Sequence, residues 1–378
     1  MLKTTPSATH RPAPRSRPPV ARAGVLEWLR QNLFSSWFNT LLTLLAVLFL
    51  VKLLPPLINW FWLDAVWHAA DPATCQAASG ACWAMIHEKY RLILFGRYPY
   101  DEQWRPLLGL LVLVAMIGVS CNRRYWKLWL IDVWLGALVL WFGLMWGGVF
   151  GLTFVPNNLW GGLPLTMILT VIGLAVAFPM SIFLALGRRS RMPVIRTLAI
   201  VYIELIRGVP LISLLFMASF MLPLFLPTGG NLDEILRAQV AIILFAAAYL
   251  AEAVRGGLQA IPQGQFEAAQ ALGLTYWQTQ RKIILPQAIK VAIPSIVNIF
   301  IGLFKDTSLV AIVSLTDLLL AMRQAIADPL WRRFFVEGYV FIAVIYFCVC
   351  FFMSKYSRYL ETQLDTGPQR QAPPSRIR

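Results

Sequence analysis

Among the charged residues inside or at the ends of long apolar runs, five are candidates for contact with a substrate: Glu204, Arg207, Glu252, Lys305 and Asp306. A charge in the centre of a membrane costs about 3 kcal/mol even on insertion scales, so such residues call for a functional reason. A substrate carboxylate suits Arg207 or Lys305, and a substrate ammonium group suits Glu204 or Asp306. The alternative is structural pairing within or between helices, since Glu204 and Arg207 are three residues apart and Lys305 adjoins Asp306.

Motifs for catalysis are missing from the sequence. It contains no G-x-x-x-x-G-K-[ST] phosphate loop, no His-Glu metal motif and no serine flanked by glycines in a nucleophile elbow. His68 and His87 are too isolated to argue for a metal site. We therefore expect no catalytic residue, no metal and no cofactor in this chain.

The composition predicts the elements that must carry the five charges. The chain has 378 residues, of which 58% are hydrophobic and only 13% charged. A bilayer core needs about 20 apolar residues per helix. Eight runs of that kind are expected to form spans: Phe38 to Leu63, Pro106 to Cys121, Leu128 to Phe150, Leu163 to Gly187, Thr197 to Leu226, Ala238 to Val254, Val291 to Leu309 and Phe334 to Ser354. Pro55 and Pro56 should kink or end the first span.

The distribution of Lys and Arg predicts the orientation, because basic residues near span ends remain in the cytoplasm. With the N-terminus inside, the cytoplasmic segments carry 22 basic residues and the external ones 8. Both termini are therefore expected in the cytoplasm. The net charge of +15 does not indicate nucleic-acid binding, because the basic residues lie between apolar runs and not on one polar face.

This orientation places Cys75 and Cys82, in the sequence CQAASGAC, in the external segment. A disulfide that closes this short loop and two free thiols are both consistent with the sequence.

The most informative stretch is IPQGQFEAAQALGLTYWQTQRKIILPQAI, residues 261–289, between the sixth and seventh spans. Pro262 suits the first turn of a helix, and Gly273 can adopt the left-handed conformation that ends one. Thr275 and Gln278 have capping-box spacing for a second helix, which Pro286 should stop. The stretch thus predicts a helix-turn-helix hairpin outside the membrane, suited to a groove on a partner.

The spacing of these residues resembles the coupling-loop motif of ABC importer permeases. The matching residues are Glu267, Ala268, Ala269, Gly273, Ile283, Leu285 and Pro286. Residues 201–216, 248–289 and 304–319, together with GGLPLTMILT at 161–170, are similar to the polar amino acid branch of these permeases. Three spans ahead of a five-span core resemble the M-type permeases of bacterial general L-amino acid transporters.

The resemblance implies an all-α integral membrane protein with a type I importer core of five helices, preceded by three extra helices. It implies transport of L-amino acids, with residues 262–286 coupled to a separate ATPase. The implied partners are a second, similar permease in a heterodimer, two ATPase subunits that bind ATP and Mg, a periplasmic amino-acid-binding protein and membrane lipid. The implied location is the bacterial inner membrane.

Four regions are expected along the chain. They are a disordered basic cytoplasmic tail at 1–37, three spans with an external segment 64–104 within 38–155, a permease core at 156–357 with its coupling loop at 256–290, and a cytoplasmic tail at 358–378. An ion-driven secondary transporter or channel is the alternative function. It accounts for spans and charges but gives the hairpin no role.

Overall fold

The computed structural model describes residues 24–69, 71–149, 151–225 and 232–364. Within these ranges the chain is helical, with two isolated β-bridges and no strand. Seven helices are long and apolar enough to cross a membrane, and the count rises to eight if one bent pair forms a single span. The prediction of an all-α membrane protein with about eight spans is confirmed.

The chain divides into two compact units, residues 1–65 and 66–378. The first unit contains α1 (Val25–Asn32), α2 (Trp37–Ile58) and a π-helical segment at Asn59–Leu63. The disordered tail predicted at 1–37 is wrong for Val25–Asn32, which is helical; residues 1–23 lie outside the described residues.

The two prolines of α2 lie close to the end of its regular α-helical part. The helix runs through Pro55 and Pro56 to Ile58, and the π-helical segment follows directly. Such local changes in hydrogen bonding let apolar spans tolerate proline.

The second unit holds all the other helices. The portion that the sequence predicts to be external has α3 (Pro72–Ala77) and α4 (Ala84–Phe95). The helices α5 (Trp104–Ser120) and α6 (Trp129–Trp146) form a pair. The remaining helices are α7 (Gly162–Arg188), α8 (Pro193–Gly208), α9 (Leu211–Phe216), α10 (Glu234–Gln259), α11 (Gln263–Ala271), α12 (Tyr276–Thr279), α13 (Leu285–Asp306), α14 (Leu318–Ile326) and α15 (Phe335–Leu364). The first residues of the cytoplasmic tail predicted from 358 continue α15 to Leu364, and residues 365–378 lie outside the described residues.

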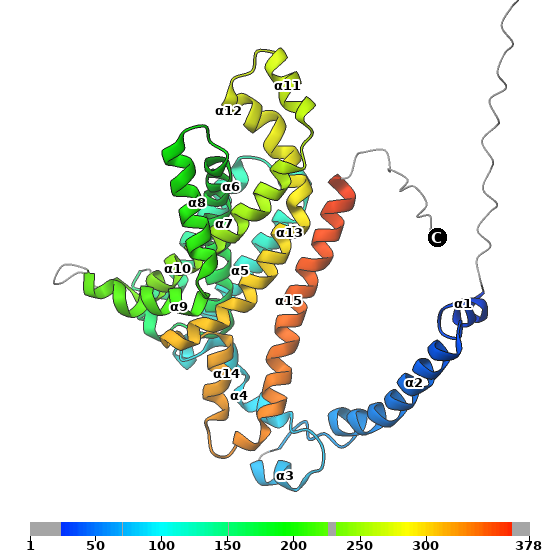
Figure 1. Ribbon diagram of the computed structural model, residues 1–378. Helices are drawn as coiled ribbons and strands as arrows, with labels where there is room; N and C mark the ends of the chain where they lie inside the picture. Colours follow the sequence, from blue (N-terminus) through cyan, green and yellow to red (C-terminus); the bar gives the residue numbers. More distant parts are fainter. Residues whose placement is uncertain (1–23, 70, 150, 226–231, 365–378) are drawn as a thin grey trace, which may run out of the picture. The chain divides into compact units, whose positions relative to one another are not determined.

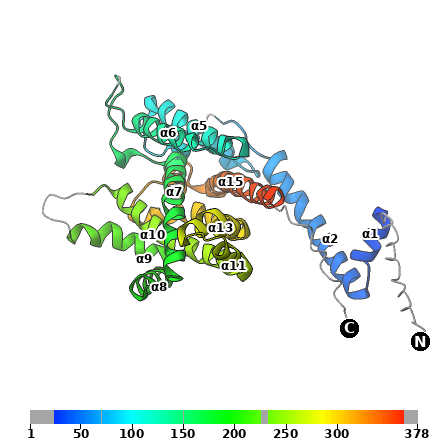
Figure 2. The same cartoon turned by 90° about the horizontal axis from the view of Figure 1, so that it is seen from above.

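At the centre of this unit α7 and α10 pack against each other, and α13 packs on α10 (Figure 1). Seen from above, α7 separates the α5–α6 pair from α10 and α13 (Figure 2). Buried alanines line α10, among them Ala241, Ala247 and Ala251. Small side chains let helix backbones approach closely, which is how spans associate without a hydrophobic drive between them.

The predicted span Thr197 to Leu226 is not one straight helix. It is split into α8 and a second segment, Leu211–Phe225, at an angle of 102°. Val209 is extended, with φ −107° and ψ 132°, immediately before Pro210. The proline ring excludes the helical conformation from the preceding residue, so α8 ends at Gly208.

Pro286 does not stop the second helix of the hairpin, contrary to the prediction. One helical segment runs from Tyr276 to Val313. A π-helical turn at Gln280–Ile284 precedes α13, and Pro286 lies in the first turn of that helix. A missing N–H is tolerated there, because the π turn has interrupted the regular hydrogen-bond ladder.

The segment predicted to be external packs onto α14 and the start of α15. Cys75, Met85, Leu318, Met322 and Trp331 belong to one buried apolar cluster. Polar contacts hold its edges: the Cys82 amide donates to buried Glu337 (2.9 Å), the Trp331 indole donates to Glu88 (3.1 Å), and Lys89 pairs with Asp328 (2.9 Å). We call residues 66–98 the cap.

Three glycines bring the cap and the core into backbone contact. Gly96 and Gly162 have positive φ, and the Gly162 amide donates to the Thr316 carbonyl (2.8 Å). A Cβ on Gly96 would lie 2.8 Å from Gly161 Cα, and one on Gly162 would overlap the Leu94 carbonyl. Only glycine fits this junction without moving a backbone.

Cys75 and Cys82 are joined in a disulfide within the cap, with their Cα atoms 5.6 Å apart. Replacing both with alanine is expected to destabilise the cap by about 2–3 kcal/mol, the entropy of closing so short a loop. Hydrogen exchange measured on residues 72–95 should accelerate, while exchange in α10 stays unchanged. The free thiol Cys121 gives the matched control, Cys121→Ala. Equal exchange in both variants would contradict a stabilising role for the disulfide.

Candidate functional site

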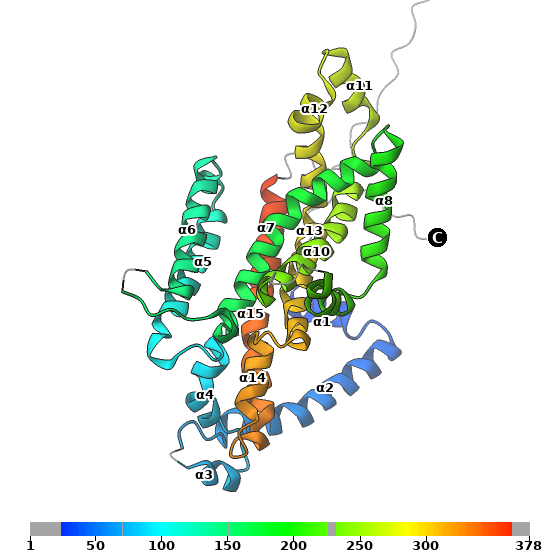
Figure 3. The same ribbon diagram turned by 90° about the vertical axis from the view of Figure 1, so that its left-hand side faces the viewer.

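The hairpin predicted from residues 261–289 is present and stands at one end of the second unit (Figure 3). Its first helix, α11, begins after Pro262 and ends at Ala271. Gly273 then adopts φ 70°, and its amide donates to the Gln270 carbonyl (2.9 Å). The turn therefore depends on a left-handed residue, as the sequence predicts.

A capping box opens the second helix of the hairpin. The Thr275 hydroxyl accepts from the Gln278 amide (3.4 Å), and the Gln278 side chain accepts from the Thr275 amide (3.0 Å). At the base of the hairpin the Gln287 amide group donates to Gln265 (3.1 Å), which ties α11 to α13.

The seven residues of the motif have different surroundings. Glu267, Ala268, Gly273 and Pro286 are exposed, and Ala269 is fully buried. Ile283 and Leu285 are partly buried against the main apolar core. The exposed part of the hairpin also carries three large apolar side chains: Leu272, Tyr276 and Trp277 are 76%, 53% and 62% exposed. One side of the hairpin is thus anchored in the bundle. The other side presents an apolar surface with one carboxylate.

Three of the five predicted charges meet in a cluster between α7, α8 and α10. Arg188 lies 2.8 Å from Glu204 and 2.7 Å from Glu252. Arg255 lies 2.6 Å and Arg207 3.9 Å from the same Glu252 carboxylate. Glu204 and Arg207 thus share a cluster, but Arg188 and Glu252 connect them. We call these five residues the ionic cluster.

Arg188 and Arg255 are the members of the ionic cluster that sequence analysis missed. The charge count assigns both to cytoplasmic segments, and their only local signal is a position at the end of an apolar run. Within the described residues, Lys305 and Asp306 form no salt bridge. They occupy the last turn of α13, at the opposite end of that helix from the hairpin.

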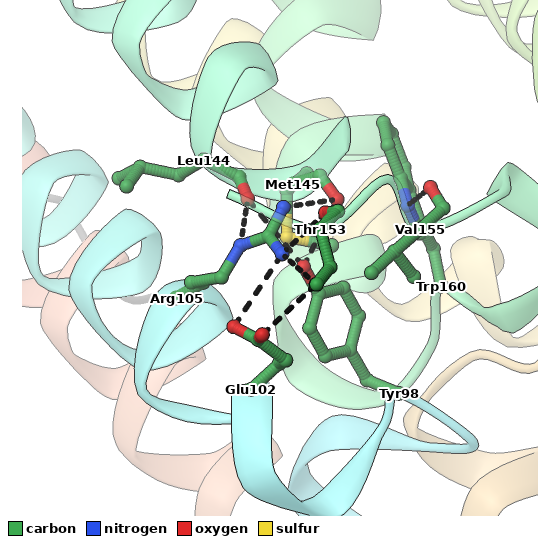
Figure 4. Close-up of polar contacts among 8 residues, drawn as sticks. All are labelled: Tyr98, Glu102, Arg105, Leu144, Met145, Thr153, Val155 and Trp160. Carbon is green, nitrogen blue, oxygen red and sulfur yellow. Dashed lines mark hydrogen bonds and ion pairs between the residues drawn. The ribbon is translucent and has the colours of Figure 1, made fainter. Parts of the chain in front are cut away.

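A buried arginine, counted by the sequence analysis only as an external charge, organises the end of the α5–α6 pair. Arg105 has no exposed surface. Its Nε donates to the Leu144 carbonyl (2.6 Å) and its Nη1 to the Thr153 carbonyl (2.9 Å), while Glu102 lies 3.5 Å away (Figure 4). The only sequence signal is the three-residue spacing between Glu102 and Arg105.

Tyr98 supports the same site. Its hydroxyl donates to the Met145 carbonyl (3.0 Å), and burial raises the pKa of Tyr98 to about 12. Arg105 and Tyr98 together satisfy the last carbonyls of α6, which have no partner within the helix.

Asp317 caps α14 from a fully buried position, and its two oxygens accept from the Leu319 and Leu320 amides (3.0 and 2.9 Å). Burial raises the pKa of Asp317 to about 6, from an ordinary value of 3.8. Because the unfolded chain then loses this proton first, the contribution of Asp317 to stability falls as pH rises from about 4 to about 6, by up to about 1.4 kcal/mol per pH unit. Above that window the contribution stays constant.

Asp317→Asn should remove this part of the pH dependence, which thermal unfolding in detergent at pH 4.5, 5.5 and 7 would measure. Asp328→Asn is the control of opposite sign, because the hydrogen bond from Lys89 lowers the pKa of Asp328. The prediction would be contradicted if the stability of Asp317→Asn changed with pH in the same way as that of the parent protein.

Comparison with known proteins gives consistent matches. The family described as "Binding-protein-dependent transport system inner membrane component" matches residues 177–365. The chain is 49% identical over 365 residues to the inner membrane amino-acid ABC transporter permease protein YhdY of Escherichia coli, covering 95% of this chain and 97% of that protein. It is 39% identical over 419 residues to the glutamate/glutamine/aspartate/asparagine transport system permease protein BztC of Rhodobacter capsulatus, covering 93% and 96%.

Among solved structures, the crystal structure of an amino acid ABC transporter with histidines matches at 33% identity and a TM-score of 0.48, covering 54% of this chain and 92% of that one. The full-length similarity to the two permeases and the family match over half of the sequence agree. On this evidence the chain belongs to the family of binding-protein-dependent transport system inner membrane components.

Proposed function

We propose that this chain is the transmembrane permease subunit of an ATP-binding-cassette importer that moves L-amino acids into the cytoplasm. The observation that carries the proposal is the hairpin α11–α12, which holds the motif residues Glu267 and Gly273 at its exposed surface. Glu267 forms no hydrogen bond or ion pair within the described part of the chain, and exposed Leu272 and Trp277 lie nearby in the sequence. This surface fits a groove on a partner protein.

The names of the relatives support the substrate class. One is an amino-acid permease, and the other belongs to a transport system for glutamate, glutamine, aspartate and asparagine. We infer a broad range of polar L-amino acids for this chain, as in the M-type permeases that its sequence resembles.

The permease works in an assembly. We propose a heterodimer with a second, similar permease, a pair of ATPase subunits, a periplasmic amino-acid-binding protein and surrounding lipid. ATP and Mg bind to the ATPase, because the sequence has no phosphate loop. The exposed residues Glu267, Ala268, Gly273 and Pro286 contact the ATPase, and Ala269, Ile283 and Leu285 fix the hairpin to the bundle.

The inner membrane location follows from the family. The hairpin and the C-terminal end of α15 lie at the same end of the second unit (Figure 1). This supports a cytoplasmic C-terminus, and the loop charges support a cytoplasmic N-terminus.

The substrate path is proposed to involve charges predicted in the apolar runs. Glu252 lies close to three arginines, which favours a structural role over contact with substrate. The side chains of Glu204 and Arg207 are 54% and 36% exposed and remain candidates for contact with substrate. Lys305 and Asp306 are candidates at the other end of α13.

Reconstitution in liposomes tests the function. The chain is combined with a second permease, the ATPase and the binding protein, and uptake of labelled glutamate and glutamine is measured with ATP or with an imposed proton or sodium gradient. We expect uptake that requires ATP and the binding protein. Uptake that survives ATP depletion and follows an ion gradient would establish the secondary-transporter alternative.

A further inference from the structure

Two adjacent arginines at the end of α7 contact different parts of the second unit. Arg188 is the last residue of α7, and Arg189 is its C-cap. The Arg188 side chain is 22% exposed, whereas Arg189 is an exposed residue. Their contacts join the hairpin to the ionic cluster.

Arg189 contacts the hairpin and the helix that leads into it. Its guanidinium carbon lies 5.7 Å from the centre of the Phe266 ring on α11, within range of a cation–π interaction. Its Nη1 donates to the carbonyl of buried Leu258 in the last turn of α10 (3.0 Å). Arg189 therefore fixes the end of α7 to both sides of the bend that starts the hairpin.

Arg188 contacts α8 and α10. Its two terminal nitrogens lie 2.8 Å from Glu204 on α8 and 2.7 Å from Glu252 on α10. Glu252 also holds Arg255 at 2.6 Å, so it keeps an ion pair when Arg188 is removed. Glu204 has no other salt bridge among the described residues, although the charge of Arg255 also acts on it.

The backbone links the hairpin directly to α10 and α13, but not to α8. Only Ala260, Ile261 and Pro262 separate α10 from α11, and α12 continues without a break into α13. A movement of the hairpin therefore reaches α10 and α13 through the backbone itself. The helix α8 has no such connection to the hairpin, although it carries Glu204 and Arg207 and leads into the 102° bend.

We propose that Arg188 and Arg189 are positioning residues that transmit movement of the α11–α12 hairpin to α8, Arg189 by holding Phe266 and Leu258, and Arg188 by holding Glu204. The proposal rests on the proposed function, because it assigns the route by which a partner ATPase acts on α8. Breaking either contact leaves ATP hydrolysis in place but weakens its connection to transport.

The test measures uptake and binding-protein-stimulated ATP hydrolysis by the complete reconstituted complex. The variants are Arg188→Gln, Arg189→Gln, the double variant and Phe266→Leu, which breaks the Arg189 contact from the other side. Arg191→Gln is the matched control, since Arg191 is exposed and makes no hydrogen bond or ion pair with the other described residues. We expect each single variant to lower the amino acids imported per ATP about tenfold, within the usual range of coupling between sites.

Because the two arginines act in series, import per ATP in the double variant should be no lower than in the more strongly affected single variant. Unchanged melting temperatures exclude a folding defect, and Arg191→Gln should behave as the parent protein does. Unchanged import per ATP in Arg189→Gln and Phe266→Leu would overturn the proposal, as would multiplying effects in the double variant. A loss of import that matches the loss of ATP hydrolysis would also overturn it.

Gly273→Pro in the same liposomes separates this inference from the proposed function. If Gly273→Pro abolishes uptake while the arginine variants transport normally, the proposed route through Arg188 and Arg189 is wrong. The proposed coupling of the hairpin to the ATPase would still stand. If Gly273→Pro transports normally, the proposed coupling role of the hairpin has failed first.

Discussion

Gly273→Pro should reduce ATP-dependent uptake about a hundredfold, together with binding-protein-stimulated ATP hydrolysis, in a complex that still inserts and assembles. Gly273 has φ 70°, whereas proline fixes φ near −65°, and proline also removes the amide that donates to Gln270 (2.9 Å). A penalty of about 3 kcal/mol lowers the population of the correctly bent hairpin by about that factor. Gly273→Ala strains φ but keeps the amide, so its ATP-dependent uptake should fall about tenfold.

Gly264→Ala is the matched control for this effect. Gly264 lies in α11, has no positive φ, and a Cβ there would meet no atom within 4 Å. We expect full uptake from Gly264→Ala. Normal uptake by an assembled Gly273→Pro complex would show that the left-handed turn is dispensable.

The largest stability effect is expected at Arg105. Arg105→Met keeps the length of the side chain but leaves the buried Leu144 carbonyl without its donor, and the carbonyl of exposed Thr153 loses a hydrogen bond as well. The unsatisfied buried carbonyl costs about 1–3 kcal/mol and the lost bond to Thr153 about 1 kcal/mol, partly offset because the arginine no longer has to be desolvated. We expect a net loss of about 3 kcal/mol and a clearly lower melting temperature in detergent.

Arg105→Lys should lie between the parent protein and Arg105→Met, because an ammonium group cannot span both carbonyls as the guanidinium does. Arg97→Met is the matched control. Arg97 is exposed and donates one bond, to the Asn158 carbonyl (3.1 Å), so its loss should cost less than about 1 kcal/mol. Equal melting temperatures for Arg97→Met and Arg105→Met would contradict the role assigned to the buried arginine.

The sequence predicts those features that local residues determine. Long apolar runs require spans, and Gly273 and the pair Thr275 and Gln278 define a turn and a cap whatever surrounds them. These predictions are confirmed at the level of individual hydrogen bonds.

Features that depend on context could not be predicted in the same way. Two prolines act in opposite ways: Pro210 ends α8, whereas Pro286 lies within a continuous helical segment because a π turn precedes it. The ionic cluster joins residues from three helices, and sequence spacing contains no information on which spans face each other. For the same reason the sequence does not distinguish Arg188 and Arg105 from ordinary loop charges, although each makes several polar contacts in the structure.

The junction of Gly96, Gly161 and Gly162 has a consequence for the history of the chain. At Gly96 and Gly162 a side chain is excluded by a backbone in the other part, so neither part can change independently there. An ancestral core that acquired the cap would have had to offer glycines at this junction already or to gain them at nearly the same time.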